Sequence, residues 1–221
     1  MIKIGEEIPI KVEAMTPQHN VGWLYVELPK NVMETLQSYI ETAKKNPISF
    51  NDKLAGNITK SLELKDKDNW FFHTILNNLC MYHEEKYPAY SKEFRFITHS
   101  VPYCLSPFWV NFQKENEFNP PHNHTGIFSF VIFVKIPTDW REQHALPISA
   151  NSNSPNASNF ALTYNTLFGD TTSTPFHLDK EMEGHMLFFP SKLTHSVYPF
   201  YNCDEERISI SGNILFDTRG E

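Results

Sequence analysis

A series of short apolar segments, separated by turn residues, makes up the chain from residue 93 onward. Segment 127–135 is apolar at nearly every position, which indicates a strand that is covered on both faces. Other segments with strand character are 94–98, 107–113, 159–167, 185–189, 196–198 and 207–216. The turn residues between them are Pro120-Pro121, Gly169-Asp170, Gly184, Pro190 and Asn202. Such a series predicts a β-sandwich or jelly roll.

The first third of the chain has a mixed pattern. Segment 22–28 has the character of a strand, while 32–44 and 68–87 carry apolar residues at helical spacing. Segment 51–64 between the helices predicts a loop with a short strand, and we expect the helices to pack on one face of a sheet. The 221 residues suit a single domain. Within it, we expect residues 1–92 to form a mixed buttress and residues 93–221 the β core.

Charge and composition exclude several classes of protein. The formal net charge of −7 argues against a nucleic-acid partner, since a global basic field is absent. No apolar run approaches the ~18 residues of a membrane span, and residues 1–7 lack the apolar core of a signal peptide. Cys80, Cys104 and Cys203 are far apart and odd in number, which favours reduced thiols over a disulfide framework. We therefore expect a cytoplasmic protein.

Two histidines stand two residues apart, directly before the most apolar strand. His122 and His124 lie in the sequence Pro121-His-Asn-His-Thr-Gly126. In an extended chain, residues i and i+2 point to the same face, so both imidazoles can bind one metal ion. Neutral imidazole suits iron, zinc, copper and nickel alike. In isolation a surface pair is the simpler interpretation, but the adjoining strand offers the rigid support that a metal site needs.

His195 is the natural third ligand. It follows segment 184–190, which predicts a turn at Gly184, then a buried strand, and the end of that strand at Pro190. His185 and His177 compete for this role, although His185 would begin a strand and His177 would lie in a polar loop. Surface or structural roles are the expectation for the remaining histidines, which are His19, His73, His83, His99 and His144.

Arg207 stands twelve residues after His195 in a strand that is otherwise largely apolar. Arg207 and Ser209 share one face of that strand, while Ile208 and Ile210 share the other. A guanidinium offers two parallel donors to a carboxylate, and a hydroxyl adds a third. A salt bridge with a neighbouring glutamate, Glu205 or Glu206, is the alternative. A buried arginine requires an anionic partner, and a keto-diacid would serve.

Taken together, these residues resemble the superfamily of 2-oxoglutarate- and iron(II)-dependent oxygenases. Its pattern is His-x-Asp/Glu, a distal His, and then Arg-x-Ser about a dozen residues later. This chain has His122-Asn-His124, His195 and Arg207-Ile-Ser209. Segments 119–132 and 189–213 are also similar to a branch of small, mostly uncharacterised members that are frequent in marine bacteriophages. The resemblance covers roughly residues 106–216.

The resemblance implies a mostly β (α+β) fold, the double-stranded β-helix or jelly roll, with N-terminal helices packed on one sheet. It also implies a non-haem dioxygenase, a hydroxylase, that uses Fe(II), 2-oxoglutarate and dioxygen. In related enzymes that act on nucleic acids, an Asn-x-Tyr before the metal pair holds the keto-acid. Asn111 fits the first position, and Gln113 replaces the tyrosine. The prime substrate stays open between a protein side chain, a small metabolite and a sugar.

His124 departs from the superfamily pattern, which has a carboxylate at this position. A third neutral ligand leaves the bound metal at charge +2, which should tighten binding of the anionic keto-acid. Two other arrangements stay open at this point: His124 turns away and water replaces it, or the metal is zinc or nickel. Two other functions also stay open. One is a cupin-like dioxygenase or zinc hydrolase, and the other is a non-catalytic binding or virion-associated sandwich.

The Asn- and Ser-rich segment 150–158 shows no periodicity, which predicts a flexible surface loop. The longer segment 137–158 is a candidate lid or specificity element.

Overall fold

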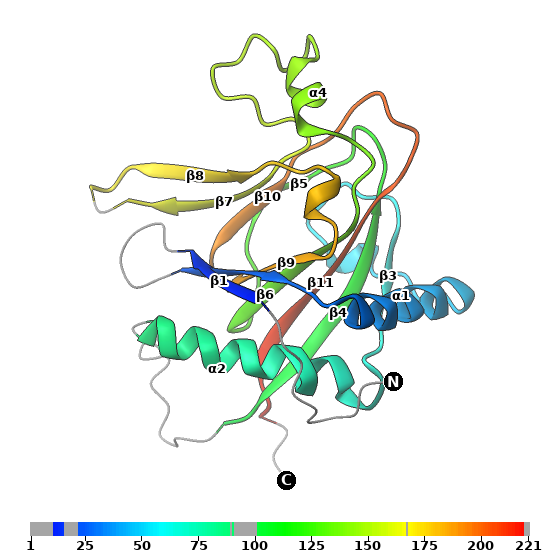
Figure 1. Cartoon of the computed structure of the whole chain (residues 1–221), viewed down its shortest axis with the longest axis vertical. Helices are drawn as coiled ribbons and strands as arrows, with labels where there is room; N and C mark the ends of the chain where they lie inside the picture. Colours follow the sequence, from blue (N-terminus) through cyan, green and yellow to red (C-terminus); the bar gives the residue numbers. More distant parts are fainter. Residues whose placement is uncertain (1–10, 16–21, 89, 91–100, 167, 219–221) are drawn as a thin grey trace.

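The computed structural model describes residues 11–15, 22–88, 90, 101–166 and 168–218, and the predicted strand at 94–98 lies outside them. Its strands form two antiparallel sheets, one of order β1-β2-β9-β6-β11-β4-β3 and one of order β5-β10-β7-β8 (Figure 1). The strands are β1 Lys11–Met15, β2 Trp23–Glu27, β3 Ser61–Glu63, β4 Tyr103–Gln113, β5 Asn119–His122, β6 Phe128–Lys135, β7 Phe160–Asn165, β8 Thr171–Phe176, β9 His185–Pro190, β10 Thr194–Val197 and β11 Arg207–Phe216. The mostly β, jelly-roll fold expected from the sequence is confirmed.

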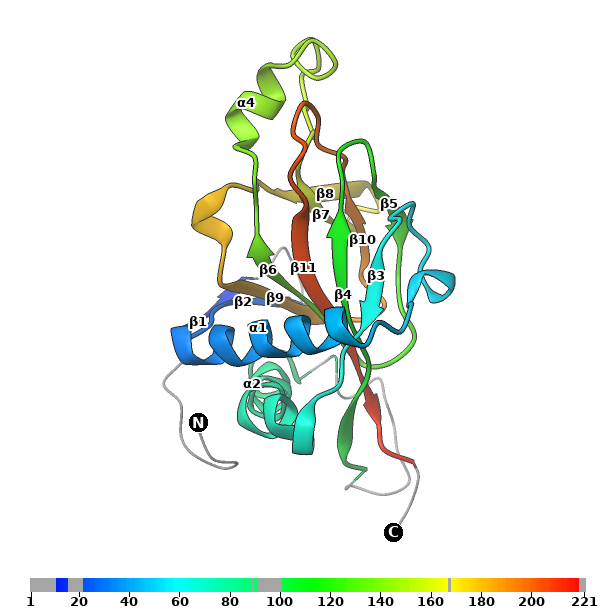
Figure 2. The same cartoon turned by 90° about the vertical axis from the view of Figure 1, so that its right-hand side faces the viewer.

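The N-terminal helices cover the outer face of the larger sheet (Figure 2). The helical elements are α1 Lys30–Lys45, η1 Asn51–Lys53, η2 Lys67–Asn69, η3 Phe72–Leu76, α2 Asn77–Lys86, α4 Trp140–Ala145 and η4 Lys180–Met182. Helix α1 confirms the pattern at 32–44. The second predicted helix is interrupted, because Asp68 and Asn69 have positive φ and η3 is a π-helix. The carboxylate of Asp66 accepts hydrogen bonds from the backbone N–H groups of Phe71 and Phe72, both at 2.8 Å, and so stabilises the start of this helical segment.

Alternation along the central strands separates two environments. On β4, Phe108, Val110 and Phe112 belong to the apolar core beneath the helices. Trp109, Asn111 and Gln113 lie on the opposite face, which looks toward the smaller sheet. Strand β11 alternates in the same way, with isoleucines on the helix side and Arg207, Ser209 and Ser211 on the other. The space between the sheets is therefore polar beside β4 and β11.

A second apolar core fills the rest of the space between the sheets. It includes Val131 and Phe133 from β6, Leu187 and Phe189 from β9, and Phe160 from β7. The polar side chains of β4 and β11 instead line a cavity between the sheets.

Several elements were not predicted from the sequence. Strand β5 contains Pro120 and Pro121, which cannot donate backbone hydrogen bonds, and it pairs only with β10 at the edge of the smaller sheet. Strand β8 consists largely of threonine and serine and forms the opposite edge. Strand β1 and the short helix α4 were also missed. Edge elements bury little apolar area, so their hydrophobic pattern is weak.

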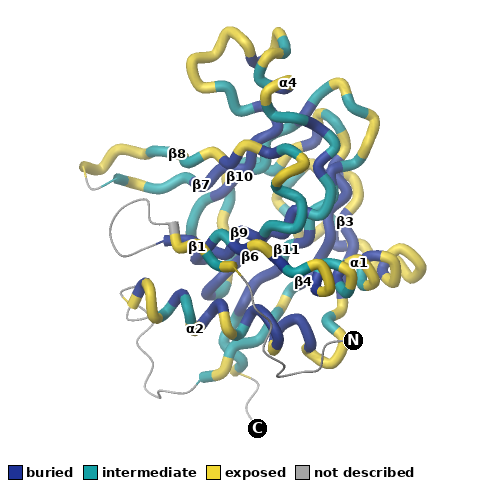
Figure 3. Tube along the Cα trace, viewed as in Figure 1, coloured by how far each residue is buried: buried dark blue, intermediate teal, exposed yellow. Residues whose placement is uncertain are grey.

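The predicted surface loop at 150–158 is wrong at its C-terminal end. Most of the segment is exposed, as the loop beside α4 shows in Figure 3, but Ala157 is only 8% exposed and Ser158 is fully buried. The backbone N–H of Ser158 donates to the carbonyl of Pro199 at 2.8 Å, which draws the chain inward before β7. Within the described ranges, no helix combines the length and apolarity needed to cross a bilayer.

Candidate metal centre and the adjoining cavity

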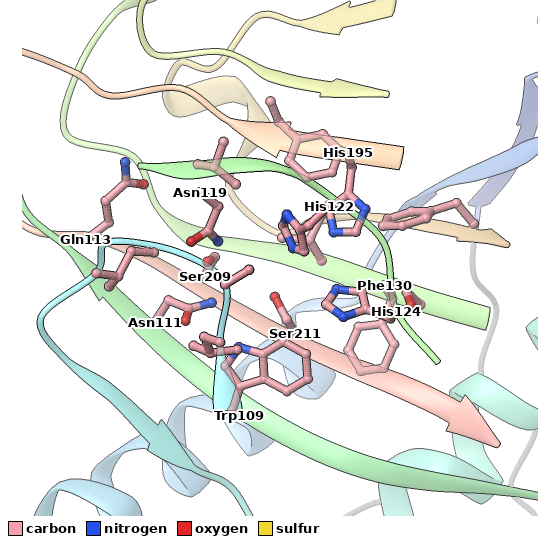
Figure 4. Close-up of a pocket in the computed structure, with 18 residues that line it drawn as sticks. Trp109, Asn111, Gln113, Asn119, His122, His124, Phe130, His195, Ser209 and Ser211 are labelled. Atoms are coloured by element: carbon pink, nitrogen blue, oxygen red, sulfur yellow. The ribbon is translucent and has the colours of Figure 1, made fainter. Parts of the chain in front are cut away.

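Pairing of β5 with β10 places His122 directly opposite His195. The two ring centroids are 4.2 Å apart, and His124 from the following turn lies 5.0 Å from His122 and 4.9 Å from His195. One ring nitrogen from each residue falls within 4.8 Å of the others. Figure 4 shows the three side chains gathered at one end of a cavity. This geometry brings together the three imidazoles selected from the sequence.

Backbone carbonyls orient two of the imidazoles. Nδ1 of His122 lies 2.7 Å from the carbonyl oxygen of Pro120, and Nδ1 of His195 lies 3.1 Å from that of Leu193. In the neutral ring, an Nδ1–H that donates to a carbonyl leaves the Nε2 lone pair free for a metal. Each histidine is thereby held by the residue two positions before it.

Burial keeps the three rings neutral. It lowers the pKa of His122, it lowers that of His195 well below its ordinary value, and with the adjacent His122 it lowers that of His124 to about 4. Neutral imidazole is the form that coordinates metal ions, so the cluster is in its ligand form at pH 7.

The turn that carries His124 is fixed at several points. The backbone N–H of His124 donates to the carbonyl of Ser191 at 2.9 Å, and the Ser191 hydroxyl donates to the carbonyl of Gly126. Gly126 has φ +110°, and a Cβ there would lie 2.7 Å from a methyl of Leu215 and 2.8 Å from the carbonyl of Ile214. The turn therefore directs His124 toward its partners rather than away from them.

The competing histidines lie elsewhere. His185 stacks on Tyr25 with ring centroids 4.9 Å apart, and His177 stacks on Trp140 at 4.4 Å. His144 also contacts Trp140 and His177. His83 is fully buried with Nε2 2.9 Å from the carbonyl oxygen of Gly22, while His73 is exposed. His19 and His99 fall outside the described residues.

Arg207 is a buried cation without a carboxylate partner among the residues that the structure describes. Its side chain is 2% exposed, and burial lowers the pKa of the guanidinium to about 9, which leaves it protonated at pH 7. Nη2 donates to the hydroxyl and carbonyl oxygens of Ser158 at 2.5 and 3.1 Å. Nη1 makes long contacts of 3.4 Å with Gln113 and 3.5 Å with the carbonyl of Tyr198, and Nε has no partner.

The alternative role for Arg207, a salt bridge to a neighbouring glutamate, is not formed. Glu205 pairs with Lys135 at 2.6 Å on the surface, and no described carboxylate lies within ion-pair distance of Arg207. A buried guanidinium without a counter-ion is costly, because neutral oxygens repay only part of its lost hydration. An anionic ligand would supply the missing charge.

The other predicted side chains lie between the histidines and Arg207. Ser209, Asn111 and Gln113 line the cavity that contains the three histidines (Figure 4). Arg207 is not among the lining residues, but its Nη1 contacts Gln113. Asn111 accepts the hydroxyl of Ser61 from β3 at 2.8 Å, which fixes its amide. The amide nitrogen of Gln113 donates to the carbonyl of Glu117 at 2.6 Å, so its oxygen is the end that meets Arg207. Gln113 therefore turns its amide oxygen toward Nη1 of Arg207.

Sequence reasoning missed part of the cavity wall. Leu54, Ala55 and Ile58, from the loop before β3, line the cavity, and so do Asn119 and Ser211. An isolated bridge from Asn57 to Phe118 joins this loop to the chain before β5. Alternation on β4 and β11 could have identified Ser211. The loop has no sequence signal, because long-range docking brings it to the site.

Two polar atoms of the wall have no protein partner. The indole Nε1 of Trp109 and the amide Oδ1 of Asn119 are both buried and unpaired among the described residues. None of the residues lining the cavity is an aspartate, glutamate, lysine or arginine. The cavity is thus polar but uncharged, and the charged Arg207 is outside its lining.

Comparison with known proteins agrees with this geometry. The model of the family described as "Putative 2OG-Fe(II) oxygenase" matches residues 107–213, a span that contains the three histidines, Arg207 and Ser209. No curated protein sequence matches the chain.

Among solved structures, a prolyl-4-hydroxylase from Pseudomonas putida aligns with a TM-score of 0.52 and 11% identity, over 89% of this chain and 93% of that one. The non-heme alpha ketoglutarate dependent epimerase SnoN from nogalamycin biosynthesis gives a TM-score of 0.52 and 13% identity, over 90% and 79%. The carbocyclase SnoK of the same biosynthesis gives 0.51 and 9%, over 91% and 85%. The chain therefore has the fold of these oxygenases.

Proposed function

We propose that the protein is a non-haem Fe(II)- and 2-oxoglutarate-dependent dioxygenase, a hydroxylase. One observation carries the proposal: a buried guanidinium without a carboxylate partner lies beside a cavity that also holds three convergent imidazoles. A zinc hydrolase or a metal-binding sandwich would need the histidines but would give Arg207 no anion to bind. A non-catalytic binding module would need neither feature. The match to an oxygenase family over the same residues supports the same conclusion.

The residues present fit both the metal and the co-substrate. His122, His124 and His195 would hold Fe(II), two of them through the Nε2 atom that their backbone contacts leave free. Arg207 and Ser209 would receive the far carboxylate of 2-oxoglutarate, and Asn111 would contact the co-substrate between them. When bound, iron(II), 2-oxoglutarate and dioxygen would supply the oxidation of a C–H bond, while the protein supplies geometry and excludes water.

Neutral ligands give the site its charge preference. Three imidazoles would leave the full +2 charge on the metal, and no carboxylate lines the cavity to compete for it. Arg207 adds a second positive charge at the other end. A dicarboxylate that reaches both charges is favoured over a monoanion, because each end neutralises one buried cation.

The prime substrate is a protein side chain or a small metabolite in this proposal. The net charge of −7 disfavours nucleic acid. The structural neighbours support the fold and do not select among substrates. A cytoplasmic location and membership of the branch frequent in marine bacteriophages stay predictions.

Anaerobic titration tests the proposal. Fe(II) is added to the protein and 2-oxoglutarate follows, and we expect a weak visible charge-transfer band that saturates. Arg207→Ala should weaken 2-oxoglutarate binding by about 10-fold or more, because a charge-assisted contact is lost. His177→Ala serves as a control, since His177 belongs to the separate cluster with Trp140. A wild-type protein that binds Fe(II) but shows no 2-oxoglutarate-dependent band would contradict the proposal.

A further inference from the structure

Ser158 holds an unusual backbone conformation at a fully buried position. Its φ is +67°, in the left-handed region that favours glycine, yet it carries a side chain and is completely buried. Such strain persists only where surrounding contacts impose it. The contacts in this case converge on Arg207.

Each polar group of Ser158 has a defined partner. Its N–H donates to the carbonyl of Pro199 at 2.8 Å. Its carbonyl and hydroxyl oxygens both accept from Nη2 of Arg207, at 3.1 and 2.5 Å. The hydroxyl also lies 3.0 Å from that of Thr138, which is 9% exposed. Because a guanidinium only donates, the Ser158 proton is free to point at Thr138. One serine thus fixes one nitrogen of the guanidinium through two oxygens.

The two ends of Arg207 are held with different strength. Nη2 makes two short bonds to Ser158, whereas the Nη1 contacts are long and Nε has no partner. The ring of Phe200 packs 4.8 Å from the guanidinium carbon, which fixes the plane. The weakly held nitrogen on the cavity side is therefore Nη1, because its contact Gln113 lines the cavity.

We propose that Ser158 is a positioning residue for the co-substrate: it anchors Nη2 of Arg207 so that Nη1, whose protein contacts are long, is left to donate to the far carboxylate of 2-oxoglutarate. This inference rests on the proposed function. A glycine would relieve the strain and keep the carbonyl, but it would lose the shorter of the two bonds.

The surrounding segment braces the same residue. In α4, the side-chain amide of Gln143 donates to the carbonyl of Tyr201 at 2.9 Å and accepts its N–H at 2.8 Å. Tyr201 follows Phe200, the ring beneath the guanidinium. Segment 137–158, considered from the sequence as a lid, thus supports Arg207 in two ways, through Ser158 and through the loop after β10 that carries Phe200 and Tyr201.

Two variants separate positioning from folding. Ser158→Gly removes the hydroxyl but relieves the backbone, so we expect a smaller loss of thermal stability than in Ser158→Ala. Ser158→Ala removes the same hydroxyl and keeps the strain, so we expect lower stability. Both should weaken 2-oxoglutarate binding to the Fe(II) protein by about tenfold, measured by the anaerobic charge-transfer band, with unchanged Fe(II) affinity.

Asn69→Gly is the matched control, because Asn69 is exposed, has φ +52° and lies in η2 on the outer side of the larger sheet. It should leave 2-oxoglutarate binding unchanged. Wild-type affinity for 2-oxoglutarate in Ser158→Gly would overturn the positioning role. If only Ser158→Ala lost affinity, the loss would reflect lower stability, and the positioning role would again be wrong. Both outcomes leave the proposed function intact, whereas absence of the band in the wild-type protein would remove the proposed function itself.

Discussion

His124 is the residue at which this site departs from the pattern of two histidines and one carboxylate. Its ring lies about equally far from the other two histidines, and a fixed turn directs it there. The i, i+2 spacing of His122 and His124, the strand context of His195 and the family resemblance together predicted this cluster, although His185 and His177 competed for the third place. Ser158 could not be predicted, since its polar loop carries no periodic signal.

Removing one imidazole should show whether all three bind metal. We expect His124→Ala to lower Fe(II) affinity by about 10-fold or more, because one of three protein ligands is lost. Competition with a coloured chelator under anaerobic conditions measures the change. His185→Ala is the control, as His185 stacks on Tyr25 away from the cluster. Affinity equal to the wild type would indicate a site of two histidines with water in the third place.

Substitution of Gly126 tests the turn that carries His124. Gly126→Ala would place a methyl 2.7–2.8 Å from Leu215 and the carbonyl of Ile214, at a φ of +110° that alanine rarely adopts. We expect a loss of about 1–3 kcal/mol in the free energy of unfolding and weaker Fe(II) binding, because the turn carries His124. Urea denaturation and the chelator assay measure the two effects. A loss of stability with unchanged Fe(II) affinity would mean that the conformation of the turn does not determine metal binding by His124.

The two faces of strand β11 lie in different environments. One face packs in the core beneath the helices, and the other presents Arg207, Ser209 and Ser211 between the sheets. The central strands were predicted because they are long and apolar, or alternate regularly. Strands β5 and β8 were not, since prolines, threonines and edge positions weaken the pattern. One of the three proposed metal ligands, His122, therefore lies on an element, β5, whose prolines predicted a turn.

Gly212 tests how closely β11 packs on its neighbours. A Cβ at this position would lie 2.7 Å from the ring of Phe130 and 3.0 Å from Leu105. We expect Gly212→Ala to lower the free energy of unfolding by about 1–3 kcal/mol through overpacking. Ser211→Ala, on the opposite face of the same strand, should change it by less than about 0.5 kcal/mol. Equal effects of the two substitutions in urea denaturation would contradict a tightly packed helix-side face.

Buried neutral histidines make the whole molecule sensitive to acid. Burial lowers the pKa of His83 from 6.5 to about 4. Between these values the unfolded chain binds a proton that the folded chain does not, so stability falls as the pH drops from 6.5 to 4 and is unaffected above 6.5. The difference corresponds to about 3 kcal/mol for this one residue.

The variant His83→Gln isolates this contribution. Glutamine can still donate to the carbonyl of Gly22 but does not titrate in this range. Relative to the variant, the wild-type protein should lose up to about 3 kcal/mol in the free energy of unfolding between pH 6.5 and 4. Urea denaturation at several pH values measures the two curves. Parallel curves would mean that the pKa of His83 is the same in the folded and unfolded states, which would contradict the prediction.

Part of the cavity wall comes from a loop that is distant in sequence from the histidines. This loop contributes Leu54, Ala55 and Ile58. These residues come from the N-terminal part of the chain, yet they line a cavity whose three histidines lie within residues 107–213. A change in this short stretch would therefore reshape the cavity wall without altering the histidines or Arg207. A fragment that starts at β4 would lose this part of the wall, together with the Ser61 hydroxyl that holds Asn111.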